Sequence, residues 1–371
     1  MKKGSICWIT ASYFLDVDLP IVPSLQKDFD IDWIVISSAK SAQSDDAYIR
    51  SQTDMPYTSL IDNGYFFSLS HYKAVRELIA RISSKSYDWY YFDISDFLFL
   101  YPMLKRHLPV DRITMAAHNA KVPAGARYAA FARMAMKYLF RHFSNFQVFS
   151  KNQLHYLQSR LPKANIFYCP LMLKDYGPLP ENKERKTTSF LFFGNIVKYK
   201  RLDLLLKAVE ILRRRGVTDF TVNIAGYCRP EVWDKQYQPM IHSSENVISD
   251  IRRIPNEEVA ALFGANDYFV MPYQDIAQSG ALTVALNYSM PVIASDLPSF
   301  HEFIEDSEHG WFFESGSAEA LADVMEKAIN TPRKEHSEMV EAIREMVKEK
   351  LSSQAIHDRY RNYFHKMISH A

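Results

Sequence analysis

The sequence predicts an α/β protein made of two doubly wound domains. Its 371 residues exceed the length of one typical domain and fit two domains of ordinary size. Short apolar runs alternate with helical segments in both halves of the chain, as in parallel sheets with crossover helices. A polar, charged and proline-bearing segment, LPENKERKTT at residues 179–188, separates the two patterns and is predicted to be a linker.

The first half carries the first set of alternating elements. Its candidate strands are residues 6–10, 33–36, 89–92, 113–116 and 146–149. Residues 71–82 and 126–141 have apolar side chains at helical spacing and are predicted to be crossover helices. The apolar run after Lys2 and Lys3 is too brief for a secretory signal, so we interpret it as the first strand.

The second half repeats the pattern with candidate strands at residues 189–195, 221–226, 268–272, 291–295 and 310–313. Capped helix starts are predicted at Asn256 and Ser317, each with an acidic residue in the first turn. Residues 353–368 form a last helix with an apolar stripe that must pack against another element.

The composition excludes several classes of protein. Apolar residues make up 47% and charged residues 23%, which is typical of a packed protein. Lys plus Arg (44) nearly cancels Asp plus Glu (43), so no overall basic charge points to nucleic acid. The three cysteines have no metal-like spacing and fit free thiols of a reducing, cytoplasmic compartment. No apolar run reaches the roughly 18 residues of a membrane-spanning helix.

Five segments of the second half occur in a distinctive order: FFGNIVKYKRLDLLLKAVEIL, TVNIAGY, RRIPNEEVAALFGANDYFVMPY, QSGALTVALNYSMPVIASDLPSFHEFI and EHGWFF. In this order they resemble the C-terminal domain of family 4 retaining glycosyltransferases. In the first half, ITMAAHNAK and IFYCPLMLKDYG resemble the family's histidine-bearing strand and the strand that leads to its hinge.

The resemblance implies the GT-B fold, in which two Rossmann-like domains face a crevice. Residues 1–178 would bind the acceptor, residues 179–350 would bind a nucleotide-sugar, and residues 351–371 would return to the first domain. The implied activity is transfer of a sugar to a glycan or lipid-linked acceptor in surface polysaccharide or glycolipid biosynthesis. No metal or other cofactor is expected. The alternative is a non-catalytic scaffold or regulatory subunit with the same fold.

Lys200 is the first candidate for the catalytic site. It follows a strand and precedes a helix, and its position matches the family's phosphate-binding lysine, whose charge would stabilise the departing diphosphate. Without the family context, the alternative is a solvated lysine at a helix start. Gly194 and Asn195 are predicted at the same turn, although many relatives carry Arg where this chain has Asn195.

The turn Gln278, Ser279 and Gly280 precedes a predicted helix, so its N–H groups would face the diphosphate or the donor sugar. The family's familiar form has two glutamates in this region, whose places fall at Ile276 and Val284. The chain therefore resembles a branch with Gln-Ser-Gly at this turn. A simple capped helix start is the alternative.

His118 follows the strand at residues 113–116 and is predicted at the carboxyl end of the sheet, facing the crevice. The resemblance implies a catalytic role there, and a structural histidine is the alternative. Arg253 lies at a turn where relatives clasp the nucleotide, so it is predicted to contact the base or a phosphate.

Arg133, Lys137 and Arg141 recur every four residues and would align as one cationic stripe on a helix. Such a stripe is predicted to meet an anionic lipid surface or a lipid-pyrophosphate acceptor, with Tyr138, Phe140 and Phe143 as apolar contacts. This peripheral contact would lie at the inner face of the membrane. The alternative is a solvated helix face.

Overall fold

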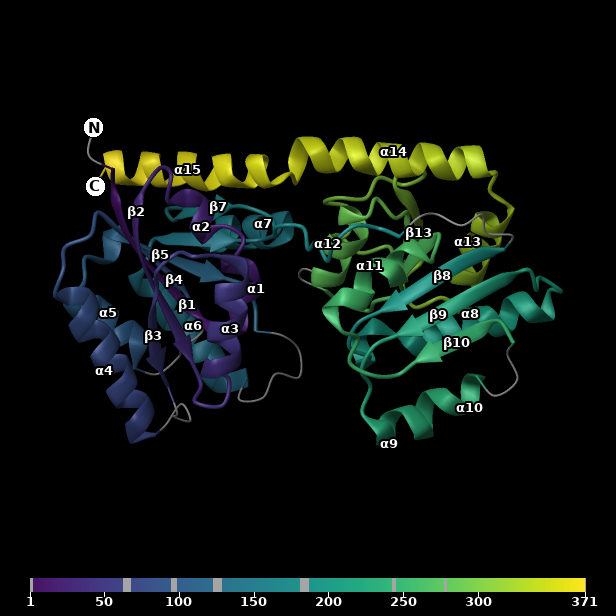
Figure 1. The fold of residues 1–371 in the computed structure, drawn as a ribbon, viewed down its shortest axis with the longest axis horizontal. Helices are drawn as coiled ribbons and strands as arrows, with labels where there is room; N and C mark the ends of the chain where they lie inside the picture. The colour runs from purple at the N-terminus through teal and green to yellow at the C-terminus, as the bar shows by residue number, and fades with distance from the viewer. Residues whose placement is uncertain are drawn as a thin grey trace. The chain divides into compact units, whose positions relative to one another are not determined.

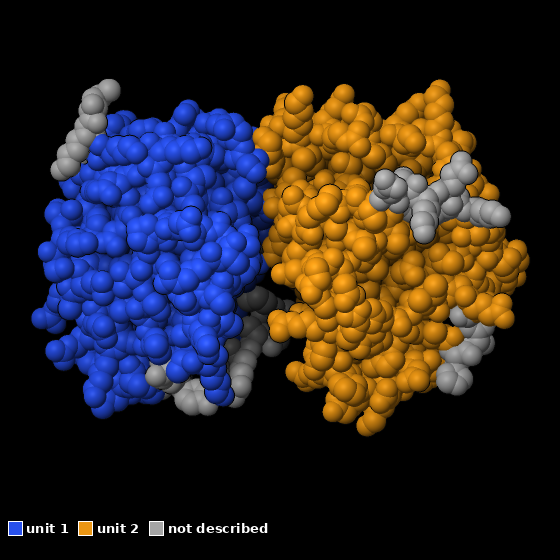
Figure 2. All heavy atoms as spheres, in the orientation of Figure 1, with its two compact units in different colours: residues 1–172, 353–371 blue, residues 173–352 orange. Residues whose placement is uncertain are grey.

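The computed structural model describes residues 3–62, 68–94, 99–122, 129–180, 187–241, 245–276 and 279–370. The chain divides into two compact units (Figures 1 and 2). Unit 1 contains Met1–Met172 and Ser353–Ala371, and unit 2 contains Leu173–Ser352.

Unit 1 is a parallel sheet flanked by helices. Its described strands pair in the order β3-β2-β1-β4-β5-β6-β7. Their bounds are β1 Ser5–Ala11, β2 Asp30–Ser37, β3 Thr58–Ile61, β4 Trp89–Asp93, β5 Ile113–Ala117, β6 Asn145–Val148 and β7 Asn165–Tyr168. The helices are η1 Ser12–Phe14, α1 Leu15–Asp18, α2 Val22–Leu25, α3 Ala42–Gln52, α4 Leu69–Ser83, α5 Leu100–His107, η2 Val110–Arg112, α6 Ala129–His142, α7 Lys151–Arg160 and α15 Ser353–Ser369.

Both faces of this sheet are buried, as expected for a parallel sheet between helical layers. Cys7 and Ile9 of β1 pack on one face with α4, α5, α6 and α7, whereas Ile6 and Trp8 pack on the other with α1, α2, α3 and α15. Successive side chains of a strand point to opposite faces, so one strand supplies both cores.

Helix α15 belongs to unit 1 although it ends the chain, and it lies against α2 and β4 (Figure 1). Its buried stripe is Ile356, Tyr360, Tyr363 and Phe364. Tyr363 also shares a hydrogen bond of 2.7 Å with Thr114 of β5. The stripe predicted from the sequence therefore packs on the sheet formed by the first half of the chain.

Unit 2 repeats the architecture with a parallel sheet in the order β10-β9-β8-β11-β12-β13. The described strands are β8 Thr188–Phe193, β9 Phe220–Ala225, β10 Val247–Asp250, β11 Tyr268–Met271, β12 Val292–Ser295 and β13 Gly310–Phe313. The helices are η3 Lys198–Lys200, α8 Leu202–Arg214, α9 Pro230–Val232, η4 Trp233–Tyr237, α10 Gln238–Ile241, α11 Asn256–Gly264, α12 Gly280–Asn287, α13 Ala318–Asn330 and α14 Arg333–Lys350.

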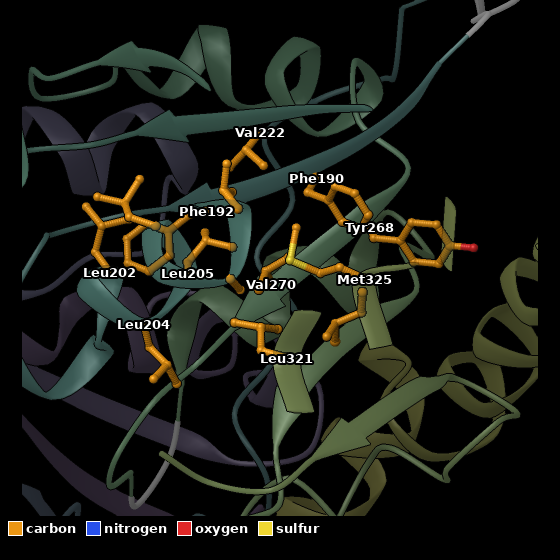
Figure 3. Close-up of a cluster of buried hydrophobic side chains, with 14 of the residues drawn as sticks. Phe190, Phe192, Leu202, Leu204, Leu205, Val222, Tyr268, Val270, Leu321 and Met325 are labelled. Carbon is orange, nitrogen blue, oxygen red and sulfur yellow. The ribbon is translucent and has the colours of Figure 1, made fainter. Parts of the chain in front are cut away.

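The core on one face of this sheet joins the strands to α8 and α13. Figure 3 shows Phe190 and Phe192 of β8 beside leucines of α8, with Leu321 and Met325 of α13 completing the cluster. The other face packs against α11, α12 and α14. These two cores fix the positions of the carboxyl ends of β8 and β11. The candidate site residues of unit 2 follow these two strands.

The structure confirms the predicted strands, with end points that differ by at most three residues. Two further strands, β3 and β10, had no predicted counterpart, and β7 was predicted only through the resemblance of IFYCPLMLKDYG to the family's strand before the hinge. All three are edge strands whose side chains are mostly half-buried or exposed, so they lack the continuous apolar run that marks a central strand. Residues 126–128 of the predicted helix and residues 181–186 of the predicted linker lie outside the described residues.

The predicted cap at Ser317 is confirmed, since its side chain accepts a hydrogen bond from Ala320 N. The predicted cap at Asn256 is wrong: Asn256 is already helical and Pro255 occupies the cap position without a side-chain bond. Proline has no side-chain oxygen that could accept a hydrogen bond from the N–H groups of the first turn, although its fixed φ suits the position before a helix.

The division into units falls at residue 172, a few residues before the predicted boundary at 178. Leu173 and Tyr176 pack against the second core, and Tyr176 N donates a 3.0 Å hydrogen bond to the Tyr288 hydroxyl. In the described part of the chain, no helix combines the length and apolar character needed to cross a bilayer. The described side chains also form no group of acidic, histidine and cysteine residues able to hold a metal ion.

Candidate active site

The turn after β8 depends on two glycines. Gly194 has φ +100° and Gly226, which directly follows β9, has φ +146°. A Cβ at Gly226 would stand 2.0 Å from the Gly194 carbonyl oxygen, so only glycine permits this approach of the two backbones. The chain thereby leaves β8 through a tight turn and enters η3, which carries Lys200.

Lys200 is a buried cation at this turn, with 8% of its surface exposed. Its Nζ lies 3.4 Å from the Phe193 carbonyl oxygen and 5.3 Å from the centre of the Tyr273 ring. Among the described residues no carboxylate pairs with it, and burial lowers the pKa of Lys200 to about 8. An anion bound here would supply the missing partner.

Other residues of this turn face solvent or are already paired. Asn195 and Lys198 are exposed. Arg201 adopts a left-handed backbone with φ 52°, and its Nε donates to Asp203 at 2.9 Å. Lys200 is thus the buried basic side chain that η3 directs at the end of β8.

Tyr273 connects this turn with the start of α12. Its ring is buried, and its hydroxyl shares a hydrogen bond with the Ser279 side chain. Ser279 caps α12, since its Oγ accepts a 3.2 Å hydrogen bond from Leu282 N. The structure therefore brings the predicted residues Gly194, Lys200 and Ser279 into one neighbourhood.

A second lysine reaches the start of α12. The Nζ of Lys174 lies 3.5 Å from the position that a Cβ would occupy at Gly280, the first residue of this helix. Sequence reasoning missed Lys174, because an isolated lysine after a strand carries no signal of its own. The first turn of α12 is the end where a helix dipole favours an anion.

The remaining predicted donor residues differ in position. Gln278 lies outside the described residues. The two positions where the family has glutamates are occupied here by apolar residues of the core of unit 2. Val284 of α12 is buried in this core, and Ile276 packs against it. No carboxylate can therefore act from either position.

Arg253 is exposed in the turn after β10, and among the described residues no contact joins it to Lys200. Its neighbour Arg252 is engaged in ion pairs with Asp250, at 2.9 Å, and with Glu258. Of the two arginines at this turn, Arg253 is the one with no ion pair recorded among the described residues.

In unit 1, His118 lies directly after β5, as predicted, and is 8% exposed. Its ring stacks between Phe14, at 3.7 Å, and Phe149, at 4.4 Å. Its Nε2 lies 2.7 Å from Oδ1 of Asp93, the last residue of β4, and its carbonyl oxygen accepts a 2.6 Å hydrogen bond from Gln153. Burial lowers the pKa of His118 to about 4, so the imidazole is neutral at physiological pH.

Two aspartates beneath His118 were missed as site residues. Asp93 is the last residue of a buried strand, and His118 directly follows another. This position at a strand's carboxyl end could have identified Asp93 as a site residue from the sequence. Asp18, in α1, accepts hydrogen bonds from Trp8 Nε1 at 2.8 Å and Thr10 Oγ1 at 2.6 Å. Both aspartates are completely buried.

Arg133, Lys137 and Arg141 are all exposed on α6, which confirms that they form one stripe. The predicted apolar contacts beside it are wrong. Phe143 is buried in the core, and Tyr138 and Phe140 pack against the same cluster, because the aromatic face of this helix covers the sheet. The stripe is a charged surface without those aromatic partners.

Residues 179–346 match the family described as Glycosyl transferases group 1. An uncharacterized 41.2 kDa protein in the cps region of Klebsiella pneumoniae is 27% identical over 143 residues, 38% of this chain and 37% of that protein. The amylovoran biosynthesis glycosyltransferase AmsK of Erwinia amylovora is 26% identical over 145 residues, 36% of this chain and 34% of that protein. The matches thus span just over a third of the length of these curated relatives.

Solved structures resemble the whole chain. A glycosyltransferase from Rickettsia africae matches with a TM-score of 0.77 at 14% identity, over 100% of both chains. HepE of Anabaena, in complex with UDP and glucose, matches with a TM-score of 0.73 at 12% identity, over 98% of this chain and 100% of that chain. The chain therefore has the GT-B fold, and residues 179–346 match the family Glycosyl transferases group 1.

Proposed function

We propose that the protein is a glycosyltransferase that moves a sugar from a nucleotide-sugar to a glycan or lipid-linked acceptor. The proposed reaction retains the anomeric configuration, needs no metal ion and belongs to surface polysaccharide or glycolipid biosynthesis at the cytoplasmic face of the membrane. The group 1 domain and the polysaccharide-biosynthesis relative AmsK support this proposal.

The buried, carboxylate-free Lys200 is the observation that carries the proposal. When the glycosidic bond to the nucleotide breaks, negative charge grows on the departing diphosphate and must be stabilised. The Lys200 ammonium at the glycine turn and the first turn of α12 offer a cation and backbone N–H groups for this purpose. Ser279 and Gly280 belong to that first turn, and Gly194 and Asn195 line the glycine turn.

Calorimetric titration with UDP, GDP and ADP in EDTA tests the donor site. We expect one of the three to bind, since the base contact selects among them while the phosphates are shared. Incubation with the matching labelled nucleotide-sugars and total lipid extract then tests transfer. Binding without transfer to any acceptor would favour the scaffold alternative, and binding of none would remove the proposed donor site.

Lys174 is proposed as the second cation of the diphosphate site, in place of the arginine that relatives carry where this chain has Asn195. The position of its ammonium beside Gly280 supports this assignment. We expect Lys174→Gln to weaken nucleoside diphosphate binding on the order of tenfold, because one charge-assisted contact is lost. The affinity of the variant should also depend less on salt.

The control for this prediction is Lys198→Gln, which removes an exposed lysine close to Lys200 in sequence. It should bind the nucleotide as the wild type does. Equal affinities of wild type and Lys174→Gln at low salt would contradict the assignment of Lys174.

The exposed stripe Arg133, Lys137 and Arg141 is proposed to meet anionic lipid. Each basic residue near an anionic surface contributes roughly 1 kcal/mol, so changing all three to Glu should lower vesicle binding about 100-fold or more. Co-sedimentation with phosphatidylglycerol vesicles measures this. The charge-matched control changes three exposed lysines of α14, namely Lys334, Lys348 and Lys350. If both triple variants lost vesicle binding equally, the effect would be one of overall charge, and the assignment of the α6 stripe would be contradicted.

A further inference from the structure

A buried hydrogen-bond network underlies His118 in unit 1. It begins at Trp33, whose Nε1 donates to Thr10 Oγ1 at 2.9 Å, and continues from Thr10 to Asp18 Oδ2 at 2.6 Å. At the other end, Asp93 Oδ1 lies 2.7 Å from His118 Nε2. The network crosses from β2 and β1 through α1 to the ends of β4 and β5.

The two aspartates meet in the middle of this network. Asp18 Oδ1 and Asp93 Oδ2 are buried, and among the described residues no N–H or hydroxyl group donates a hydrogen bond to either oxygen. The two side chains lie within hydrogen-bonding reach of each other. Two ionised carboxylates cannot face one another in a buried site, whereas one proton between them satisfies both oxygens.

The charge of the network agrees with this arrangement. Burial raises the pKa of both Asp18 and Asp93 well above the usual value, which favours a proton on the pair. The remaining negative charge is stabilised by donors from Trp8, Thr10 and His118. No neighbouring cation is needed.

The state of His118 follows from its partner. A neutral imidazole has one N–H, and Asp93 Oδ1 is an acceptor as long as the shared proton lies between the other two oxygens. The hydrogen is therefore on Nε2, and the lone pair is on Nδ1. Stacking between Phe14 and Phe149 fixes the plane of the ring.

We propose that Asp18 and Asp93 are positioning residues, a carboxyl pair that shares one proton and holds His118 as the neutral Nε2–H tautomer at the carboxyl end of β5. This leaves Nδ1 as the hydrogen-bond acceptor of the ring. Its use toward a sugar hydroxyl rests on the proposed function, whereas the shared proton and the tautomer do not.

Other titratable groups near the pair must be considered in any pH experiment. They are Asp16 on α1, Tyr91 on β4 and Tyr360 on α15. Burial raises the pKa of Tyr91 and Tyr360, so both stay neutral through the range used below. Asp16 is common to all variants and cancels in their comparison.

Nitrogen NMR of histidine-labelled protein tests the tautomer directly. The signal of His118 is assigned by its loss in His118→Gln. We expect the pattern of a neutral Nε2–H ring at every pH between 6 and 8.5. An Nδ1–H ring or an imidazolium at neutral pH would overturn the proposal, and no substrate is needed for this measurement.

The shared proton is tested by Asp18→Asn and Asp93→Asn, which are isosteric and place a permanent N–H where the proton lies. A group whose pKa is raised in the folded state stabilises the fold below its unfolded pKa and loses that contribution as the pH rises. The wild type should therefore become less stable than either variant as the pH rises. Its unfolding equilibrium constant should increase about tenfold per pH unit relative to that of the variant. Urea unfolding between about pH 7.5 and 8.5 measures this, above the range in which an unfolded histidine titrates.

Parallel pH dependences of wild type and both variants would show that the pair holds no extra proton and would overturn the proposal. If a variant does not fold, the wild-type NMR result still decides the tautomer. Should no nucleotide-sugar bind or react, the proposed function fails while these two measurements keep their meaning.

Discussion

Replacing Lys200 by methionine is expected to lower the affinity for the nucleoside diphosphate about 100-fold or more. Methionine keeps the length and burial of the side chain but carries no charge to pair with a phosphate. Calorimetric titration in EDTA, with the nucleotide that the wild type selects, gives the two affinities. Lys198→Met is the matched control, because it removes an exposed lysine from the same short helix.

The same substitution should raise the melting temperature of the nucleotide-free protein. Burial lowers the pKa of Lys200 from 10.5 to about 8, which corresponds to a folding penalty of about 3 kcal/mol at neutral pH. The apolar methionine has no such penalty. A site that binds anions is thus expected to cost stability when it is empty.

The sign of the pH dependence follows from the lowered pKa. The unfolded chain binds the Lys200 proton more tightly than the folded chain, so wild-type stability rises as the pH increases from 8 to 10.5. The difference in melting temperature between Lys200→Met and wild type should be largest near pH 7 and should close toward pH 10.5. A variant that binds nucleotide normally, or one less stable than wild type at pH 7, would contradict the role given to this lysine.

Replacing Phe364 by alanine is expected to destabilise unit 1 by about 3 to 5 kcal/mol. The side chain is completely buried, and its ring packs edge-on against Trp8 at 5.7 Å and Phe29 at 5.9 Å. The truncation would leave a cavity between α15 and the sheet, which rigid neighbours on several strands cannot fill.

Hydrogen exchange distinguishes a loss of stability confined to unit 1 from a loss of stability in both units. Protection of β1 and β4 should fall, whereas protection of β8 and β11 should change little, because they belong to the core of unit 2. Asn362→Ala, on the exposed face of the same helix, is the control and should leave both units unchanged. Equal loss of protection in both units would mean that they unfold together, contrary to this expectation.

Among the site residues, those tied to the end of a central strand were predictable. Lys200 and His118 each follow a buried apolar strand, and parallel strands place such residues at one edge of the sheet. Lys174 was not predictable, since it gains its position from the way its segment packs beside α12. The aromatic side chains beside the α6 stripe were misjudged, because helical spacing alone did not tell which of them cover the core.

The sequence by itself determined the two parallel sheets and their central strands, because apolar runs and helical periodicity are local properties of the chain. The return of the last helix to unit 1 was implied by the family resemblance. Only the tertiary structure revealed the edge strands β3 and β10, the burial of Lys200 without a carboxylate partner among the described residues, and the meeting of Asp18 with Asp93. Asp18 and Asp93 lie far apart in the sequence, and their protonation depends on desolvation and on each other. Such coupling exists only after β1, β4 and α1 have packed together, so no pattern in the sequence records it.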